Sequence, residues 1–371
     1  MGVISPSTVE EAAVALKELN APVRPLGTGS RAGWGGPDPA DTVGLSTSGL
    51  NRILEHNPGD FTAVFQAGVS LADAQTALAA EGQWLAVDPP EPSGTIGGLV
   101  ATADSGPARH RYGGVRDLII GITVVLSDGT VASAGGKVIK NVAGYDLGKL
   151  FTGSFGTLGL IASVAFRLHP RPARTVTVTA MAADPATLGQ TAIELAGQPL
   201  EALSLDAWWR GNAGGLHLRF GGVAAAEQAQ RALPFFGRLN NVSTVSDDEA
   251  LWAGQRSAQR EPGGAVLKVS GRITDLAAVV EAARAAGARL VSRAGLGISW
   301  LSFADDADLD ERIALVRRAV HPRPATLLDG ADRLADPWPP RSPAVVAVMQ
   351  RVKARFDPAG RFRPGTFVGG L

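Results

Sequence analysis

The chain has 371 residues and no cysteine. This absence excludes disulfide bonds, thiolate nucleophiles, zinc sites built on cysteine and iron–sulfur clusters held by cysteine. Together with a first segment, Met1–Pro6, that lacks the basic and apolar regions of a secretory signal, it leads us to expect a cytoplasmic protein. Glycine, proline or charge interrupts every apolar run before it could cross a bilayer. Any contact with the inner face of the cell membrane is therefore expected through a partner.

The chain also lacks a charge imbalance and a histidine cluster. Its 35 acidic and 35 basic residues give a formal net charge of +0, so nothing indicates nucleic acid or an anionic membrane as the main partner. Five histidines lie far apart in the sequence without metal-ligand spacing, so no metal site is expected. These are His56, His110, His169, His217 and His321. No segment matches the Walker A phosphate loop or the Gly-x-Ser-x-Gly nucleophile elbow.

Glycine, in contrast, is abundant, with 46 residues. Three segments combine glycine with small and hydroxyl residues, at Pro25–Arg31, Ser93–Gly106 and Gly153–Gly159. Glycine lets the backbone approach another group closely, and such loops offer unobstructed N–H donors. Because three of these loops occur within one region, the sequence predicts a large phosphate-bearing cofactor that is held by backbone.

The first of these loops is not a dinucleotide-binding fingerprint. The spacing of Gly27, Gly29 and Gly33 places the third glycine one residue late, and the Gly- and Pro-rich segment Trp34–Pro39 that follows is a poor helix. The alternatives are an ordinary surface loop and a phosphate-contacting loop of another kind. We favour the second, because similar loops recur later in the chain.

Hydrophobic periodicity predicts helices and strands along the whole chain. Helices are expected at Ser7–Leu19, Ser70–Ala80, Thr274–Ala286, Asp308–Val320 and Ser342–Phe356. Strands are expected at Val23–Leu26, Phe61–Ala67, Ile119–Leu126, Val131–Ala134, Leu160–Leu168, Thr175–Thr179, Leu216–Phe220 and Val266–Val269.

Local signals mark the ends of some elements. Ser7 with Glu10, and Ser70 with Asp73, have capping-box spacing at two helix starts. The Asp128-Gly129 pair predicts a hairpin turn. Two Pro-rich segments, 169–172 and 337–340, predict boundaries, and the alternation of strands and Ala-rich helices between them is typical of an α+β domain.

The segment Lys137–Leu147 embeds polar residues and glycine among apolar ones, and it holds one of only two tyrosines in the chain. It is either a surface turn with a packed tyrosine or a loop that lines the cofactor or substrate cleft. His110 lies next to the Gly-rich region as well, and is either a structural histidine or a group near the reactive centre.

The order of these loops, with Gly113–Asp117 and Lys137–Leu147 between the last two, resembles FAD-linked oxidases of the vanillyl-alcohol oxidase/PCMH flavoprotein superfamily. The resemblance is specific in 24–31, 93–117 and 137–161, extends to 349–365, and is weak over about 175–335. Within the superfamily, Ser105–Pro107 and Lys140–Asp146 look most like the FAD-binding subunit of bacterial glycolate oxidase complexes.

That resemblance implies an α+β fold in three parts. Residues 1–170 would form a PCMH-type FAD-binding domain of two α/β subdomains, and residues 171–340 a small α+β cap over the flavin. Residues 341–371 would return to the FAD domain as a helix and tail. The implied FAD contacts fall on the three loops and beside them, at Pro25, Gly27, Thr28, Gly29, Ser30, Arg31, Pro89, Gly94, Thr95, Gly97, Gly98, Ala101, Thr102, Ser105, Gly106, Gly159 and Ile161.

Two departures from the superfamily pattern matter. Some members attach FAD covalently through a histidine in the first loop, where this chain has Ser30 and Arg31, so we expect noncovalent FAD. Larger catalytic relatives carry a His-rich metal and substrate site in the cap, where His217 stands alone. The resemblance therefore leaves the substrate-oxidising role of this chain in question.

The expected function is that of an FAD-binding subunit in a glycolate, or 2-hydroxy-acid, oxidase or dehydrogenase complex. A base and a carboxylate-binding cation would assist hydride transfer to the flavin, and the candidates are Arg111, Lys140 and Tyr145. Because the chain cannot hold a cysteine-ligated cluster, electrons would leave to an iron–sulfur partner beside a related FAD-linked catalytic subunit. The alternatives are a self-sufficient FAD oxidase or dehydrogenase and a non-catalytic assembly subunit that binds FAD for stability.

Overall fold

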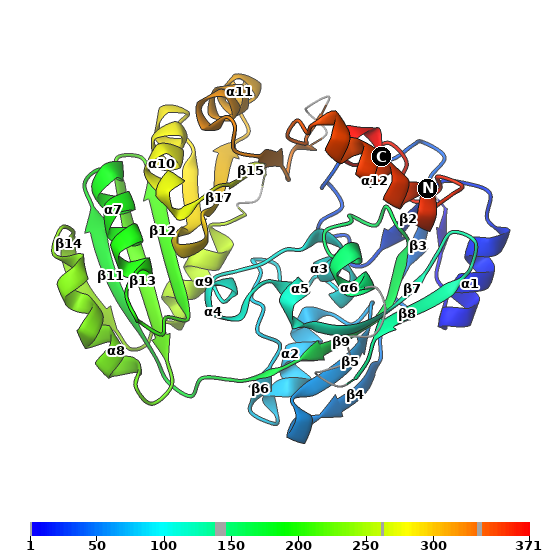
Figure 1. The fold of residues 1–371 in the computed structure, drawn as a ribbon, viewed down its shortest axis with the longest axis horizontal. Coiled ribbons are helices and arrows are strands. Elements are labelled where there is room, and N and C mark those ends of the chain that lie inside the picture. Colours follow the sequence, from blue (N-terminus) through cyan, green and yellow to red (C-terminus); the bar gives the residue numbers. More distant parts are fainter. Residues whose placement is uncertain (1, 138–145, 261–262, 332–335) are drawn as a thin grey trace.

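The computed structural model describes residues 2–137, 146–260, 263–331 and 336–371. Figure 1 shows two masses joined side by side. The N-terminal part, residues 2–170, lies together with the C-terminal helix, and the middle part, residues 171–340, carries the largest sheet. The division of the chain into domains at these residues remains a prediction.

The N-terminal part contains two main sheets. A small parallel sheet has the strand order β1-β3-β2, and a larger antiparallel sheet has the order β4-β5-β9-β7-β8. The strands are β1 (Val3–Ile4), β2 (Val23–Leu26), β3 (Val43–Ser46), β4 (Ile53–Asn57), β5 (Thr62–Gln66), β7 (Ile119–Val125), β8 (Val131–Gly135) and β9 (Leu160–Arg167). A further pair, β6 (Gln83–Trp84) and β10 (His169–Pro170), closes this part of the chain.

Short helices pack around these sheets because each has one apolar side. Buried residues of α2 and α3 join the strands β5, β7 and β9 in one hydrophobic cluster. The helices are α1 (Val9–Glu18), α2 (Leu71–Ala79), α3 (Ile96–Thr102), α4 (Arg109–Tyr112), α5 (Val115–Leu118) and α6 (Leu147–Phe151). The first β-sheet and the second are bridged by a separate cluster, in which Leu16 of α1 meets Leu45 and Val125.

The middle part is built on one antiparallel sheet of eight strands, in the order β14-β11-β13-β12-β16-β17-β15-β18. Its strands are β11 (Thr175–Ala182), β12 (Ser204–Arg210), β13 (Ala213–Gly221), β14 (Asn240–Val245), β15 (Gly264–Ser270), β16 (Arg289–Arg293), β17 (Ile298–Ala304) and β18 (Ala325–Leu327). Its helices are α7 (Pro185–Ala196), α8 (Ala225–Ala232), α9 (Glu249–Ser257), α10 (Leu276–Ala285) and α11 (Leu309–Val320). Figure 1 shows α7, α8, α10 and α11 on the side of the sheet away from the N-terminal part.

The two faces of this sheet differ in chemistry because side chains alternate along each strand. On β15, Leu267 and Val269 belong to the aliphatic core beneath the helices, whereas Val266 belongs to a cluster with Trp34 of the N-terminal part. The same alternation runs through β12, β13, β16 and β17. It leaves Asp206, His217, Arg219, Lys268, Arg293 and Trp300 out of the helix-covered core. We call this second face the inner face.

The C-terminal segment packs on the N-terminal part. After α12 (Pro343–Phe356), the backbone of Arg361 and Arg363 exchanges hydrogen bonds with that of Val23, at 2.7 and 3.0 Å. The Phe362 side chain between them is fully buried in the cluster around α1. Strand β2, which leads into the first Gly-rich loop, is thus held by β3 on one side and by the tail on the other.

Most sequence-based element boundaries agree with the structure to within a few residues, and one cap differs. Ser70 caps α2 as predicted, accepting from the Asp73 N–H at 3.0 Å. At α1 the cap is Thr8, which accepts from the Glu11 N–H at 3.0 Å, so the predicted pair Ser7/Glu10 was wrong by one residue. Ser7, the residue before the cap, donates its N–H to the Glu11 carboxylate at 2.7 Å, one residue earlier than in a capping box.

His217 lies on the inner face, where its ring stacks on Trp208 with 6.3 Å between centroids. Its Nδ1 and the Thr179 hydroxyl are 2.9 Å apart. Burial lowers the pKa of His217 to about 4. A histidine in an unfolded chain has a pKa near 6.5. Between about pH 6.5 and pH 4, His217 is therefore protonated in the unfolded chain and neutral in the folded chain.

We therefore predict that His217 lowers the free energy of unfolding as pH falls from about 6.5 to 4. The loss at pH 5 is on the order of 1–2 kcal/mol. His217→Gln keeps an amide partner for Thr179 and cannot titrate. The measurement is the melting temperature of both proteins at pH 7.5 and pH 5. Between pH 7.5 and pH 5 the melting temperature of the wild type should fall more than that of the variant. Equal falls in the two proteins would contradict the lowered pKa of His217.

Candidate functional site

The first Gly-rich loop follows β2 and leaves its N–H groups unused. Among the hydrogen bonds of the described residues, none is donated by the backbone of Gly27, Thr28, Gly29, Ser30 or Arg31. Gly29 has a φ of +77°, which favours glycine. Consecutive free N–H groups at close range are what a diphosphate requires, so the loop fits the cofactor expected from the sequence.

The second Gly-rich segment, Ser93–Gly106, was predicted as a loop with free N–H groups, and this was wrong for residues 96–102, which form α3. The N–H groups at the start of α3 are already bonded, those of Ile96 and Gly97 to the carbonyls of Val69 and Ala67.

The start of this segment, which we continue to call the second loop, lies against the first loop. A Cβ at Gly27 would lie 2.3 Å from the Thr95 hydroxyl oxygen, so only glycine permits this approach. Thr95 is the N-cap of α3 and accepts from the Gly98 N–H at 3.2 Å. The next two glycines have different surroundings: a Cβ at Gly97 would lie 2.8 Å from the Ala67 Cβ, whereas one at Gly98 would meet only the Thr95 hydroxyl at 3.3 Å.

A cleft runs between these loops and the third. Thirteen of the residues expected to contact FAD line it: Pro25, Gly27, Thr28, Gly29, Ser30, Arg31, Thr95, Gly97, Gly98, Ala101, Thr102, Gly159 and Ile161. Sequence reasoning missed Arg24, Leu26, Ala32, Thr47, Phe155, Gly156, Leu160 and Arg363 as lining residues. Arg363 could not be assigned from local pattern, because it reaches the cleft from the tail by pairing with Asp38 at 2.8 Å.

Four other predicted contacts lie outside this lining. Gly94 packs on the Arg31 guanidinium, since a Cβ there would lie 2.3 Å from its Nη1. Gly106 packs on the backbone of Asp88, and Ser105 offers its carbonyl to Gln259 at 3.1 Å. Pro89 lines a separate cleft between the N-terminal and middle parts. These residues shape the second loop, and their contact with FAD remains a prediction.

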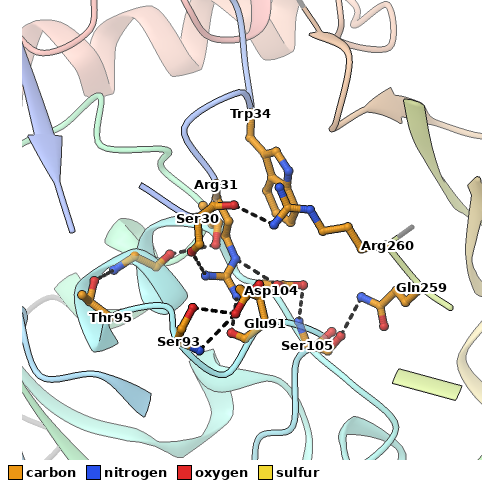
Figure 2. Close-up of polar contacts among 12 residues, drawn as sticks. Ser30, Arg31, Trp34, Glu91, Ser93, Thr95, Asp104, Ser105, Gln259 and Arg260 are labelled. Carbon is orange, nitrogen blue, oxygen red and sulfur yellow. Dashed lines mark hydrogen bonds and ion pairs between the residues drawn. The ribbon is translucent and has the colours of Figure 1, made fainter. Parts of the chain in front are cut away.

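Arg31 ties the first loop to the second (Figure 2). Its Nε and Nη2 both donate to one oxygen of Asp104, at 2.9 and 2.7 Å. Both side chains are buried, with 5% and 2% of their surface exposed. Removing either partner would leave a buried charge uncompensated, so the pair holds the two loops in register.

Two consecutive residues after α9 connect the middle part to these loops, as Figure 2 shows. Gln259 donates to the carbonyl of Ser105 at 3.1 Å, and Arg260 donates to the carbonyl of Ser30 at 2.7 Å. The Arg260 guanidinium also donates two hydrogen bonds of 2.6 Å to the Asp329 carboxylate. It lies over the Trp34 ring, 5.3 Å from the ring centroid. The Trp34 N–H donates to the same carboxylate at 2.9 Å.

The inner face carries cations near the second loop. Lys268 is half-buried, makes no hydrogen bond or ion pair among the described residues, and lies 5.7 Å from the Trp300 ring centroid. Burial, followed by the positive charge of Arg109, lowers the pKa of Lys268 to about 8. Arg293 is fully buried, donates to Asp206 at 2.5 Å, and lies over the Trp300 ring. An anion that entered beside Lys268 and Arg109 would relieve their mutual repulsion.

The predicted catalytic candidates are dispersed. The Arg111 side chain is 46% exposed and lies 3.5 Å from Glu201. Lys140 and Tyr145 fall outside the described residues. His110 does not line this cleft and packs against Gly295 of the middle part, with its Nδ1 buried without a partner among the described residues. Their roles remain predictions.

Within the described ranges, no group of three His, Asp or Glu side chains is placed to hold a metal ion. The described helices also include none that is long and apolar enough to cross a membrane.

Residues 1–135 match the family described as FAD binding domain. The chain is 36% identical over 187 residues to glycolate oxidase subunit GlcD of Bacillus subtilis (strain 168), a match that covers 48% of this chain and 39% of that protein. It is 34% identical over 148 residues to glycolate oxidase subunit GlcE of Escherichia coli (strain K12), covering 39% of this chain and 42% of that one. The matched part of the chain thus spans about two fifths of each relative.

The fold is similar to that of alkyldihydroxyacetonephosphate synthase, with a TM-score of 0.74 at 16% sequence identity. That similarity covers 98% of this chain and 77% of the synthase. It confirms the fold class that the sequence resemblance implied, including the middle part where the sequence resemblance is weak. At this identity it concerns the fold alone.

The contrast between neighbouring glycines yields a test of the cleft. We predict that Gly98→Val folds, because its Cβ would meet only the Thr95 hydroxyl, but loses FAD because the side chain projects into the cleft. The matched control is Gly97→Val, whose side chain would collide with Ala67 and should destabilise the fold itself. Circular dichroism and the flavin absorbance of the purified proteins separate the two outcomes. A folded Gly98→Val protein with stoichiometric FAD would contradict the assignment.

Proposed function

We propose that this chain, whose residues 1–135 are an FAD-binding domain, is an FAD-dependent oxidoreductase acting on the CH–OH group of a small 2-hydroxy acid. It would work as the FAD-binding subunit of a complex of the glycolate oxidase type. The observation that carries the proposal is that Lys268 of the inner face, which forms no ion pair among the described residues, lies beside Arg109 of α4.

A 2-hydroxy acid presents a carboxylate next to the carbon that is oxidised. The charge of Arg109 acts on Lys268, and neither cation forms an ion pair among the described residues, although Asp104 lies close enough to act on Lys268 and Asp117 on Arg109. A carboxylate placed between them would be bound by charge-assisted hydrogen bonds, with Trp300 as an apolar wall on one side. The chain would thereby orient the adjacent CH–OH group toward the cleft.

FAD, when bound, supplies the hydride acceptor for such an oxidation. The protein's share is to bind the acid, orient it and accept the hydroxyl proton. Arg111, Lys140 and Tyr145 remain the candidates for proton transfer and further carboxylate binding. Electrons would then leave to a protein partner, since the chain has no cysteine to hold a cluster. We propose an iron–sulfur subunit and a related FAD-linked catalytic subunit as partners, on the inner side of the cell membrane.

The attachment of FAD is the first thing to measure. We predict that acid precipitation of the purified yellow protein releases all flavin to the supernatant, because the first loop holds Ser30 and Arg31 where covalent attachment would need histidine. Flavin that stays with the pellet would contradict noncovalent binding, and a colourless protein that cannot be reconstituted would contradict binding.

The second test is anaerobic reduction of the bound flavin by glycolate and by lactate, with the chain in complex with its partner subunits. We predict that Lys268→Met raises the acid concentration needed for half-maximal reduction about 10- to 100-fold, because one charged contact is lost. Lys17→Met, on the exposed side of α1, is the control and should change nothing. Unchanged dependence in Lys268→Met would exclude that lysine from acid binding.

Steady-state turnover separates the proposal from its alternatives. We expect the isolated chain to oxidise neither acid at the rates of ordinary enzymes, roughly 1–1000 per second, with oxygen or a quinone as acceptor. Such rates from the isolated chain would favour a self-sufficient oxidase or dehydrogenase. A complex whose turnover survives loss of FAD from this chain would favour an assembly subunit.

A further inference from the structure

Arg260 lies in the middle part, and all three nitrogens of its guanidinium donate hydrogen bonds. Nε and Nη2 bind the two oxygens of Asp329, and Nη1 binds the backbone carbonyl of Ser30 in the first FAD loop. In Figure 2 the guanidinium lies over Trp34, and its Nη1 points to the Ser30 carbonyl. The contact therefore reaches across from the middle part to the peptide backbone of the cofactor loop.

The acceptor belongs to a tight turn. The N–H of Ala32 donates to the carbonyl of Gly29 at 2.9 Å, so Ser30 and Arg31 are the two central residues of a β-turn. The peptide that joins them is planar and trans, and its C=O and N–H point in opposite directions. A Ser30 carbonyl turned toward Arg260 thus turns the Arg31 N–H away from the middle part. That N–H has no acceptor among the described residues, and Arg31 lines the cleft.

The central peptide of a β-turn is its least restrained unit, because the closing bond involves the residues on either side of it. A flip of this peptide would present a carbonyl oxygen to the cleft where an N–H is needed. Carbonyl oxygen repels a phosphate, so the direction of this one peptide decides whether its contact with a bound diphosphate is attractive or repulsive.

We propose that Arg260 is a positioning residue for FAD: it holds the Ser30–Arg31 peptide in the direction that aims the Arg31 N–H into the cleft. Asp329 and Trp34 hold the guanidinium in place for this purpose. The proposal rests on the proposed FAD site, and it makes the seating of the middle part a condition for tight cofactor binding. Gln259, the preceding residue, binds the Ser105 carbonyl of the second loop and keeps the same segment in register.

The middle part supplies a closely matched control. Arg219 binds both oxygens of Asp248, at 3.1 and 2.7 Å, and lies over the Trp252 ring at 5.5 Å. Its paired hydrogen bonds to a carboxylate and its aromatic neighbour resemble those of Arg260. All of the partners of Arg219, however, lie in the middle part. A general loss of stability in this part should therefore appear equally in variants of either arginine.

The experiment compares Arg260→Lys and Arg260→Ala with Arg219→Lys in the full chain. Lysine keeps a charge beside Asp329 but lacks the planar fork that serves Asp329 and Ser30 together. The measurements are the dissociation constants of FAD and of ADP, which carries the diphosphate without the flavin, and the melting temperature of each apoprotein. We expect both ligands to bind about tenfold more weakly to the Arg260 variants and within twofold of wild type to Arg219→Lys.

Three results would overturn the proposal. FAD binding within twofold of wild type in both Arg260 variants would show that the peptide needs no support. An equal loss in Arg219→Lys would assign the effect to general stability. Weakened FAD with unchanged ADP would place the action of Arg260 away from the diphosphate. A wild-type chain that binds no FAD would instead overturn the proposed function, and the proposal with it.

Discussion

The close approach of Gly27 to Thr95 is the constraint on which the cleft depends. With 2.3 Å between a hypothetical Cβ and the Thr95 hydroxyl, no other residue type permits this contact. Thr95 is committed to capping α3, and its hydroxyl cannot move without uncapping the Gly98 N–H. The two loops are therefore set at one spacing, and the first loop keeps its N–H groups free because it is held by neighbours rather than by its own hydrogen bonds.

Two kinds of polar contact preserve that arrangement from outside the cleft. The buried pair Arg31–Asp104 joins the loops to each other, and the consecutive residues Gln259 and Arg260 join them to the middle part. Such contacts are directional, whereas apolar packing alone would tolerate small shifts. The inner face of the eight-stranded sheet can then place charged groups, among them Lys268, at a defined position relative to the cofactor cleft.

Some of the strands and helices could be predicted from local signals, and so could the type of cofactor. Helices such as α3 and α7, and strands such as β12 and β16, were not predicted. Strand β7 follows from its β-branched run, and the start of α2 follows from the spacing of Ser70 and Asp73. The start of α1 was misplaced by one residue because Ser7 and Thr8 both fit a cap, and only the path of the incoming chain decides between them. Glycine and hydroxyl residues in three segments indicated a phosphate-bearing ligand. Backbone N–H groups bind phosphate, and bulky side chains beside them would block its approach.

What the sequence by itself determined is the composition of each loop: glycine where backbone must come close, and no cysteine for disulfides or clusters. What only the tertiary structure decided is which distant side chains meet those loops. Arg363 arrives from the tail, Arg260 from the segment after α9, and Lys268 from a strand that reads as an ordinary core strand apart from its one charge. No local pattern carries this information, because pairing across more than 200 residues follows from how whole sheets and helices bury their apolar faces.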